Sequence, residues 1–310
     1  SRGNAAGWVA PWPERRAFDL MAASNSMHGE LASAVSIELG IHGPWQVISS
    51  GCAASLDAMG MAWMMLKQGV VSRAIVIGVE LPLLPEVIEL YEKTGVLAKS
   101  SVNDPYSADA GGFFPGEAGA AVVLETIDAL AERKSRVKSA DKTGCFTHEH
   151  GSGDVCMTGY WCNSDANSPI GMPTDGKGLR DCLIKAVNDL RDEPEITAVC
   201  PHASGTLLHG KAEIEAMSAA LPDDRTYSLH PLKPFTGHAV GASGLLDCVL
   251  LTYFMRAQSL PPNLAGITSP GEPFTLTPNT LSYDGSTVLK IAVGMGGHNS
   301  IVSLRSPEGS

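Results

Sequence analysis

The chain has 310 residues, 44% of them apolar, with glycine and proline spread along its length rather than gathered in tails. A chain of this size can bury a large core, and we expect two similar-sized halves. Its formal net charge of −11 argues against a nucleic-acid-binding surface, because phosphate contacts need clustered Lys and Arg side chains. We therefore expect a small molecule or another protein as the partner.

The seven cysteines contain no CxxC pair, which favours reduced thiols over a disulfide framework. The apolar stretch 244–255 is interrupted by Asp247 and is too short to span a bilayer, and no charged-then-apolar leader opens the chain. The sequence therefore predicts a cytoplasmic protein without a membrane segment.

In the first half, strands are expected to alternate with helices. The apolar run 45–50 predicts a strand, and the run from about 53 to 68 predicts a long helix. Residues 73–79 and 118–125 are continuous apolar runs, which are typical of strands buried on both faces of a sheet. The glycines and proline of residues 103–112 indicate irregular backbone.

The second half repeats this alternation. The polar stretch 131–142 predicts a helix end and the connection between the halves. After it we expect helices at 178–190 and 239–258, a strand at 196–200, and a hairpin formed by residues 288–293 and 300–304.

Cys52 is the candidate nucleophile, because it lies between the expected strand 45–50 and the expected helix from 53. Backbone N–H groups and the positive end of the helix dipole at such a position favour the thiolate. Gly51 and the small residues 53–55 allow a ligand to approach closely, although a free cysteine is more commonly an inert, buried apolar group.

Two histidines complete this candidate site. His202 directly follows the strand 196–200, and His238 precedes the helix 239–258 in a segment that echoes the surroundings of Cys52. Taken singly, either histidine is more simply explained by a structural role. Together with one thiol they suit acyl transfer, in which the thiolate attacks a thioester while neutral imidazoles donate hydrogen bonds to a developing oxyanion or enolate.

Five motifs in order resemble the β-ketoacyl synthases of the thiolase superfamily, and the first is closest to ketosynthase subunits of type II polyketide and fatty acid systems. They are SSGCAASLDAMG, PYSADAGGFFPGEAGAAVVLE, PHASGT with Glu213 downstream, LKPFTGHAVGASG and GMGGHNSIVSL. The resemblance implies an α/β thiolase-like fold with two pseudo-repeated halves in an αβαβα layered arrangement. The halves would be residues 1–130, which carry the nucleophile and look incomplete at their start, and residues 131–310, which carry both histidines.

The resemblance also implies a reaction, the decarboxylative Claisen condensation of a Cys-bound acyl chain with malonyl-acyl carrier protein. Cys52 would carry the acyl chain, and His202 and His238 would stabilise the enolate. Lys233 and Glu117 would orient the histidines, and the backbone N–H groups of Cys52 and Met295 would form the oxyanion hole. Substrate-binding positions by the same resemblance are Thr206, Gly294, Gly296, Gly297 and Asn299.

No metal or organic cofactor is expected, since the carrier's phosphopantetheine arm delivers the acyl groups. The expected partners are an acyl carrier protein and a ketosynthase-like subunit, in a homodimer or a heterodimer, with no nucleic acid and no membrane. Cys145, His148, His150 and Cys156 carry side chains that zinc could use, but their spacing fits no standard finger.

The sequence departs from the family pattern at several positions. Met295 takes the place of the usual aromatic gate, HASGT replaces HGTGT, and His209 and Gly210 replace a polar pair. Only 51 residues precede Cys52, fewer than the family usually has, which indicates either a fragment of a longer chain or strands supplied by another polypeptide. Two other functions stay open, a non-elongating acyltransferase or cysteine thioester hydrolase, and an inactive partner subunit of a ketosynthase heterodimer.

Overall fold

The computed structural model describes residues 27–99, 101–140 and 154–306. The chain divides into two compact units, residues 1–48 and 49–310, and each is described by itself. The described part of the first unit holds helix α3 (Glu30–Leu39), which ends at Gly40 in the left-handed conformation, with its N–H bonded to the last turn. Residues 45–50 form no strand, so that prediction is wrong. No described strand pairs with them to form the ladder that a strand requires.

The second unit begins with a short turn and a helix, η1 (Gly51–Ala53) and α4 (Ala54–Lys67). Strands β1 (Arg73–Glu80) and β2 (Ala118–Glu125) then pair antiparallel along their whole length, and α5 (Pro85–Thr94) lies between them in sequence. Val76 is buried, whereas Val79 and Val123 are exposed. The expectation of burial on both faces is therefore corrected: helices α4 and α10 (Ser243–Arg256) cover one face.

The larger sheet of this unit has six strands in the order β3-β10-β9-β4-β5-β7. The hairpin of β9 (Thr287–Gly294) and β10 (His298–Arg305) confirms the predicted one. The remaining strands are β3 (Cys156–Ser164), which is antiparallel to β10, and the parallel strands β4 (Ile196–Cys200), β5 (Tyr227–Leu229) and β7 (Phe274–Thr275).

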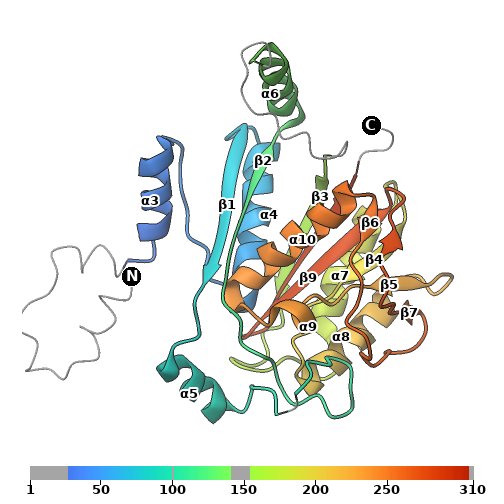
Figure 1. The fold of residues 1–310 in the computed structure, drawn as a ribbon. Coiled ribbons are helices and arrows are strands. Elements are labelled where there is room, and N and C mark those ends of the chain that lie inside the picture. The colour runs from blue at the N-terminus through green and yellow to red at the C-terminus, as the bar shows by residue number, and fades with distance from the viewer. Residues whose placement is uncertain (1–26, 100, 141–153, 307–310) are drawn as a thin grey trace, which may run out of the picture. The chain divides into compact units, whose positions relative to one another are not determined.

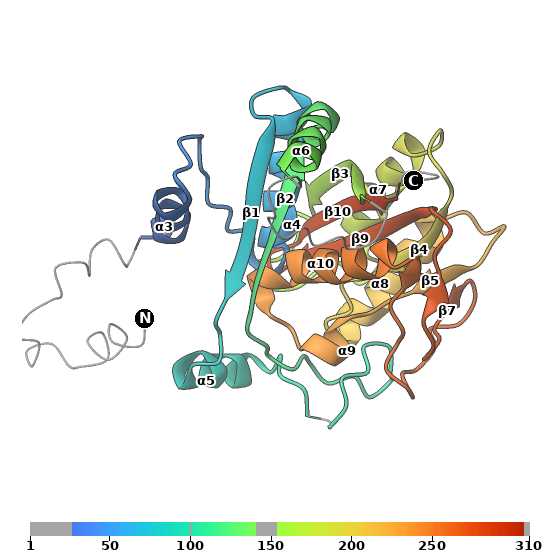
Figure 2. The same ribbon diagram turned by 45° about the horizontal axis from the view of Figure 1, so that its top comes forward.

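Helices cover both faces of this sheet (Figures 1 and 2). Helices α4 and α10 pack between it and the β1-β2 pair, while α7 (Lys177–Asp189) and α8 (Leu207–Ala220) pack against the opposite face. Within residues 49–310 the layers are therefore sheet, helix, sheet, helix. The other elements are α6 (Ile127–Ala140), α9 (Lys233–Thr236), η3 (Val240–Ala242), β6 (Ser259–Leu260) and β8 (Leu281–Ser282).

Strand β9 shows how the core is divided between the two faces. Val288 and Ala292 belong to the cluster around α4 and α10, whereas Leu289 and Ile291 belong to the cluster around α7 and α8. Burial of one such aliphatic side chain contributes about 1.5–3 kcal/mol. Lys290 lies on the α10 face by the same alternation, although every residue of β9 is buried. A charged group in this position needs a partner.

A helix that crosses a lipid bilayer needs about 20 consecutive, mostly apolar residues. None of the described helices is both long enough and apolar enough to do so.

Candidate active site

Cys52 lies in the middle of the turn η1, directly before helix α4. Gly51 has a φ of 62°, a conformation that glycine adopts without strain. A Cβ at this position would lie 3.7 Å from the backbone nitrogen of Met295, so η1 lies close to the loop after β9. The thiol therefore lies at the start of helix α4 and close to the end of the buried strand β9.

The protonation state of Cys52 differs from the one expected. Burial raises the pKa of the thiol, and the Lys233 charge and the backbone N–H groups of Met295 and Cys52 lower it by less. These backbone N–H groups act on the thiol pKa in the predicted direction, but desolvation outweighs them. The resting side chain is a thiol that must give up its proton during attack.

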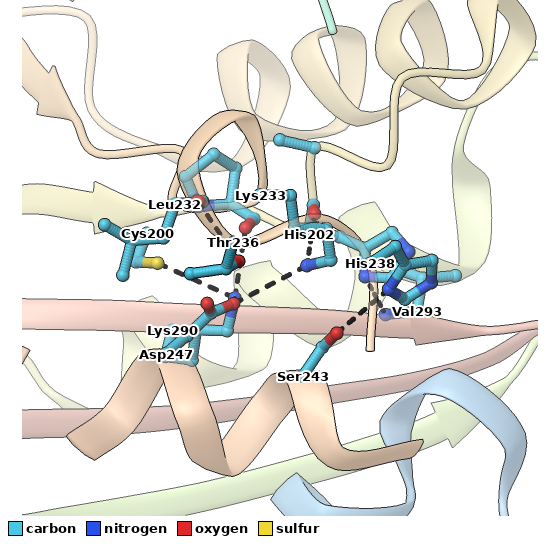
Figure 3. A network of polar contacts seen from close by, with 12 residues as sticks. Cys200, His202, Leu232, Lys233, Thr236, His238, Ser243, Asp247, Lys290 and Val293 are labelled. Atoms are coloured by element: carbon cyan, nitrogen blue, oxygen red, sulfur yellow. Dashed lines mark hydrogen bonds and ion pairs between the residues drawn. The ribbon is translucent and has the colours of Figure 1, made fainter. Parts of the chain in front are cut away.

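His202 and His238 are both buried and face one another. Their ring centroids are 5.3 Å apart and the rings are nearly perpendicular, at 86°. The backbone N–H of Val293 donates to Nδ1 of His202 over 3.3 Å, which leaves the proton of the neutral ring on Nε2. His238 Nδ1 contacts Ser243 Oγ at 2.9 Å (Figure 3).

Both imidazoles are held in the neutral form. Burial, and then the Lys233 charge, lower the pKa of His202 and of His238 well below the ordinary value. A neutral ring can accept the thiol proton or donate one hydrogen bond, so the pair suits both parts of acyl transfer.

A buried ionic network lies beside the histidines (Figure 3). Lys233 is 2% exposed; its Nζ donates to the His202 carbonyl over 2.6 Å and lies 3.5 Å from Asp247 Oδ2. Lys290, fully buried, contacts the same Asp247 oxygen at 2.5 Å. Burial works against the Lys290 ammonium, but Asp247 and other neighbours outweigh it and raise its pKa.

Glu213 fixes the backbone that carries His202. Its carboxylate, on α8, accepts from the backbone N–H of His202 over 2.5 Å and from that of Ala203 over 2.9 Å. Two such bonds to a buried carboxylate hold the His202 segment in one orientation.

A cavity of about 390 Å³ brings the predicted groups together. Cys52, His202 and His238 all line it, as do Thr206, Gly294 and Met295 from the predicted set. Met295 is 49% exposed, so its side chain also reaches solvent.

The structure places four predicted residues elsewhere. Glu117 is exposed and accepts from the Leu83 N–H over 3.2 Å, so its contacts do not orient a histidine. Gly296, Gly297 and Asn299 do not line the cavity. Asn299 is fully buried and donates to Asn163 and Asp165, which anchors the neighbouring loop.

Several residues of the site were given no role by the sequence prediction. They are His209, Glu213, Asp247 and Lys290. Asp247 interrupts an apolar helix and Lys290 interrupts an apolar strand, and such isolated charges signal a buried pair. His209 could have been noticed in the sequence, because it replaces one residue of a polar pair in the family pattern.

Of the four side chains that zinc could use, only that of Cys156 belongs to the described residues. Cys145, His148 and His150 lie outside the described residues, and Cys156 begins β3. Across residues 27–99, 101–140 and 154–306, no group of His, Cys, Asp and Glu side chains could hold a metal ion. The six described cysteines are free thiols.

Solved structures of ketosynthases share this fold. A type II PKS acyl-carrier protein in complex with its ketosynthase contains a chain that matches 98% of this one with a TM-score of 0.82 and 23% identity, over 73% of that chain. The ishigamide ketosynthase/chain length factor matches 94% of this chain with a TM-score of 0.77 and 22% identity, over 68% of its own chain. This similarity defines a mixed α/β fold of the ketosynthase, thiolase-like class.

The sequence matches a family over both parts of the chain. Residues 8–129 match the Beta-ketoacyl synthase, N-terminal domain, and residues 155–266 match the Beta-ketoacyl synthase, C-terminal domain. The chain belongs to the beta-ketoacyl synthase family, whose members are condensing enzymes of the acyltransferase type. The predicted family is thereby confirmed, while the boundary between residues 130 and 131 stays a prediction.

Its curated relatives include proteins of polyketide synthesis. A Streptomyces cyaneus protein named as a polyketide beta-ketoacyl synthase is 26% identical, over 96% of this chain and 70% of its own length. The tetracenomycin ketoacyl synthase alpha subunit of Streptomyces glaucescens is 25% identical, over 88% of this chain and 63% of its own length. The chain thus spans roughly two thirds of these relatives.

Proposed function

We propose that this protein is a β-ketoacyl synthase of polyketide biosynthesis that condenses a Cys52-bound acyl chain with a malonyl group on an acyl carrier protein. The observation that carries the proposal is that one cavity is lined by the Cys52 thiol and the buried His202 and His238 rings.

In the first half-reaction, the Cys52 sulfur attacks the thioester of the incoming acyl chain. A neutral imidazole of the cavity accepts the thiol proton, which the departing carrier thiolate then takes up. The oxyanion is held by the backbone N–H groups of Cys52 and Met295, both of which stabilise negative charge at the Cys52 sulfur. The product is an acyl group on Cys52 and a free carrier thiol.

In the second half-reaction, a malonyl thioester enters the cavity. The bond between its α-carbon and its carboxylate breaks, CO₂ leaves, and the electron pair forms an enolate. The Nε2–H of His202 can donate to the enolate oxygen, because Nδ1 of this ring already accepts from Val293. The enolate carbon attacks the acyl group and displaces the Cys52 thiolate.

The partners form part of the same proposal. The acyl carrier protein supplies both thioesters, and a second ketosynthase-like subunit completes a homodimer or a heterodimer. The relatives support this, since one solved structure is of a carrier protein with its ketosynthase and another is of a ketosynthase/chain length factor. The five-layered arrangement with two pseudo-repeated halves belongs to the proposal as well.

Intact-mass spectrometry after incubation with an acyl carrier protein tests the function. The protein should gain the mass of one acyl group, and malonyl carrier protein should then release it as an extended product. Cys52→Ala should abolish both steps. Cys162→Ala, which removes an exposed thiol outside the cavity, is the matched control and should behave as the parent.

Other outcomes point to other functions. Release of free acid without malonyl carrier protein indicates a thioester hydrolase, and acyl transfer to another acceptor indicates a non-elongating acyltransferase. A protein that takes up no acyl mass is an inactive subunit. Elongation by Cys52→Ala would show that the nucleophile is assigned to the wrong residue.

A further inference from the structure

A third imidazole lines the cavity beside the two predicted ones. His209 lies in the first turn of α8, and its ring centroid is 4.7 Å from that of His202, with an angle of 55° between the planes. His202 is therefore in ring contact with both His209 and His238. The proposed reaction so far gives His209 no part.

Close backbone contacts at Gly205 and Gly210 hold the segment that carries His209 against a neighbouring loop. A Cβ at Gly210 would lie 2.4 Å from the Pro105 carbonyl oxygen, and a Cβ at Gly205 would lie 2.5 Å from the Gly112 carbonyl oxygen. Only glycine permits both approaches, so the first turn of α8 packs tightly against the loop before β2.

One nitrogen of His209 has an unsatisfied hydrogen-bonding capacity. Its Nε2 is buried and has no hydrogen-bond partner among the described residues. Buried polar atoms are normally paired, and an unpaired one is destabilising. Burial also lowers the pKa of His209 to about 4, so the ring is neutral at pH 7. The ring that carries this unpaired nitrogen lines the cavity.

The other polar groups of the cavity leave one part of the substrate without a partner. Among the described residues that line it, none is Asp, Glu, Lys or Arg. In the proposed reaction, the backbone N–H groups of Cys52 and Met295 serve the acyl oxyanion, and His202 serves the enolate oxygen. The carboxylate of the malonyl group is the one anion of the substrate that these groups do not serve.

We propose that His209 is a substrate-binding residue whose Nε2–H donates a hydrogen bond to the carboxylate of the malonyl group. The inference rests on the proposed function and deepens it by assigning the site of the extender's carboxylate. The bond between the α-carbon and the carboxylate then breaks, CO₂ leaves, the electron pair passes to the enolate, and His209 keeps its proton.

A neutral donor suits this step better than a cation. The negative charge moves from the carboxylate to the enolate oxygen as CO₂ forms, so a lysine on the carboxylate would stabilise the ground state more than the transition state. A neutral imidazole orients the carboxylate with a weaker preference for the ground state. Both buried lysines of the site are held on Asp247, away from the cavity lining.

Two substitutions of similar size separate hydrogen bonding from packing. His209→Gln places an amide N–H near the position of Nε2, and His209→Phe keeps a ring without a donor. We expect His209→Phe to raise the KM for malonyl carrier protein, measured by CO₂ release, about tenfold or more, because a bond to a charged group is lost. His209→Gln should stay within about threefold of the parent, by the same scale. In His209→Phe, acylation of Cys52, which involves no carboxylate, should fall by a smaller factor than the use of malonyl carrier protein.

Thermal unfolding and Cys52 acylation verify that each variant is folded. If His209→Phe does not fold, His209→Asn replaces it, since its amide reaches only the position of Nδ1. An unchanged KM in the donor-free variant, or an equal loss of acylation and malonyl use in both variants, overturns the role of His209 alone. Failure of the parent protein to acylate Cys52 or to extend the chain overturns the proposed function, and this inference with it.

Discussion

At the scale of single residues, Asp247 is the charge on which the buried part of the site depends. Its carboxylate is within 2.5 Å of the Lys290 ammonium and 3.5 Å of that of Lys233. All three side chains are buried, so neither lysine has water to compensate for a lost partner. Lys233 in turn holds the His202 carbonyl.

Replacement of Asp247 by Ala should therefore destabilise the fold by about 3–5 kcal/mol, because two buried ammonium groups lose their carboxylate. Urea unfolding of the parent and the variant measures this difference. The matched control is Asp181→Ala, which removes an ion pair to Lys177 from a side chain that is 45% exposed. The control should lose less than about 1 kcal/mol. Equal losses in the two variants would contradict a dependence on burial.

The candidate catalytic residues could be predicted from the sequence, whereas most of the residues that support them, Lys233 excepted, could not. Cys52, His202 and His238 lie in recognisable motifs, and the structure brings all three to one cavity. Glu117 was assigned from motif position alone, and its side chain points to Leu83 instead. Lys290 acts through a partner 43 positions away in sequence, and such pairing depends on tertiary packing that a motif does not encode.

At the scale of elements, the structure has two similar elbows that pack against each other. Turn η1 leads into α4, turn η3 leads into α10, and both helices have 14 residues. The similar sequences that begin at Gly51 and Gly237 predicted two such elements. That sequence similarity aligned Cys52 with His238. The structure pairs the turns instead, so that Gly51 corresponds to Val240, which also has a positive φ. His238 lies ahead of its helix, next to Pro115.

The contact between the elbows predicts the effect of one added methyl group. A Cβ at Gly244 would lie 2.9 Å from the Leu56 Cβ, well inside the 3.5–4.0 Å optimum for two carbons. We expect Gly244→Ala to destabilise the protein by about 1–3 kcal/mol, despite the better helix propensity of alanine. It should also slow acylation of Cys52, because α4 and α10 must move apart.

Urea unfolding and intact-mass kinetics measure the two effects. Gly119→Ala is the control, since a Cβ there meets only a Val79 methyl group at 3.9 Å, an ordinary contact. The control should unfold within about 0.5 kcal/mol of the parent. A stabilised Gly244→Ala variant would show that the elbows have room to separate.

At the scale of the whole molecule, several imidazoles are buried in the neutral state. His202, His209 and His238 line the cavity, and His230 is buried away from it, with Nδ1 2.6 Å from the Pro261 carbonyl oxygen. Burial lowers the pKa of all four, to about 4 for His209 and His230. These four rings therefore take up protons at a lower pH in the folded protein than in the unfolded chain.

The sign of the resulting pH dependence follows from these shifts. The unfolded chain binds a proton at each histidine near pH 6.5, whereas the folded chain does so only at lower pH. The stability from the four rings is therefore complete above pH 6.5 and declines as the pH falls, by up to about 1.4 kcal/mol per pH unit for each ring. The bond to Asp57 raises the pKa of His298, so its contribution is complete below pH 6.5 and does not oppose the decline.

Urea unfolding at pH 6.5, 5.75 and 5.0 should show the free energy of unfolding decreasing steadily. His230→Gln removes one titrating ring outside the cavity, so its curve should be flatter by up to about 1.4 kcal/mol per pH unit, even though the variant starts from a lower stability. His298→Gln serves as the control, because the raised pKa of this ring means that its contribution to stability is not lost as the pH falls from 6.5 to 5.0. A parent protein whose stability is constant from pH 6.5 to 5.0 would mean that the buried rings take up protons without unfolding.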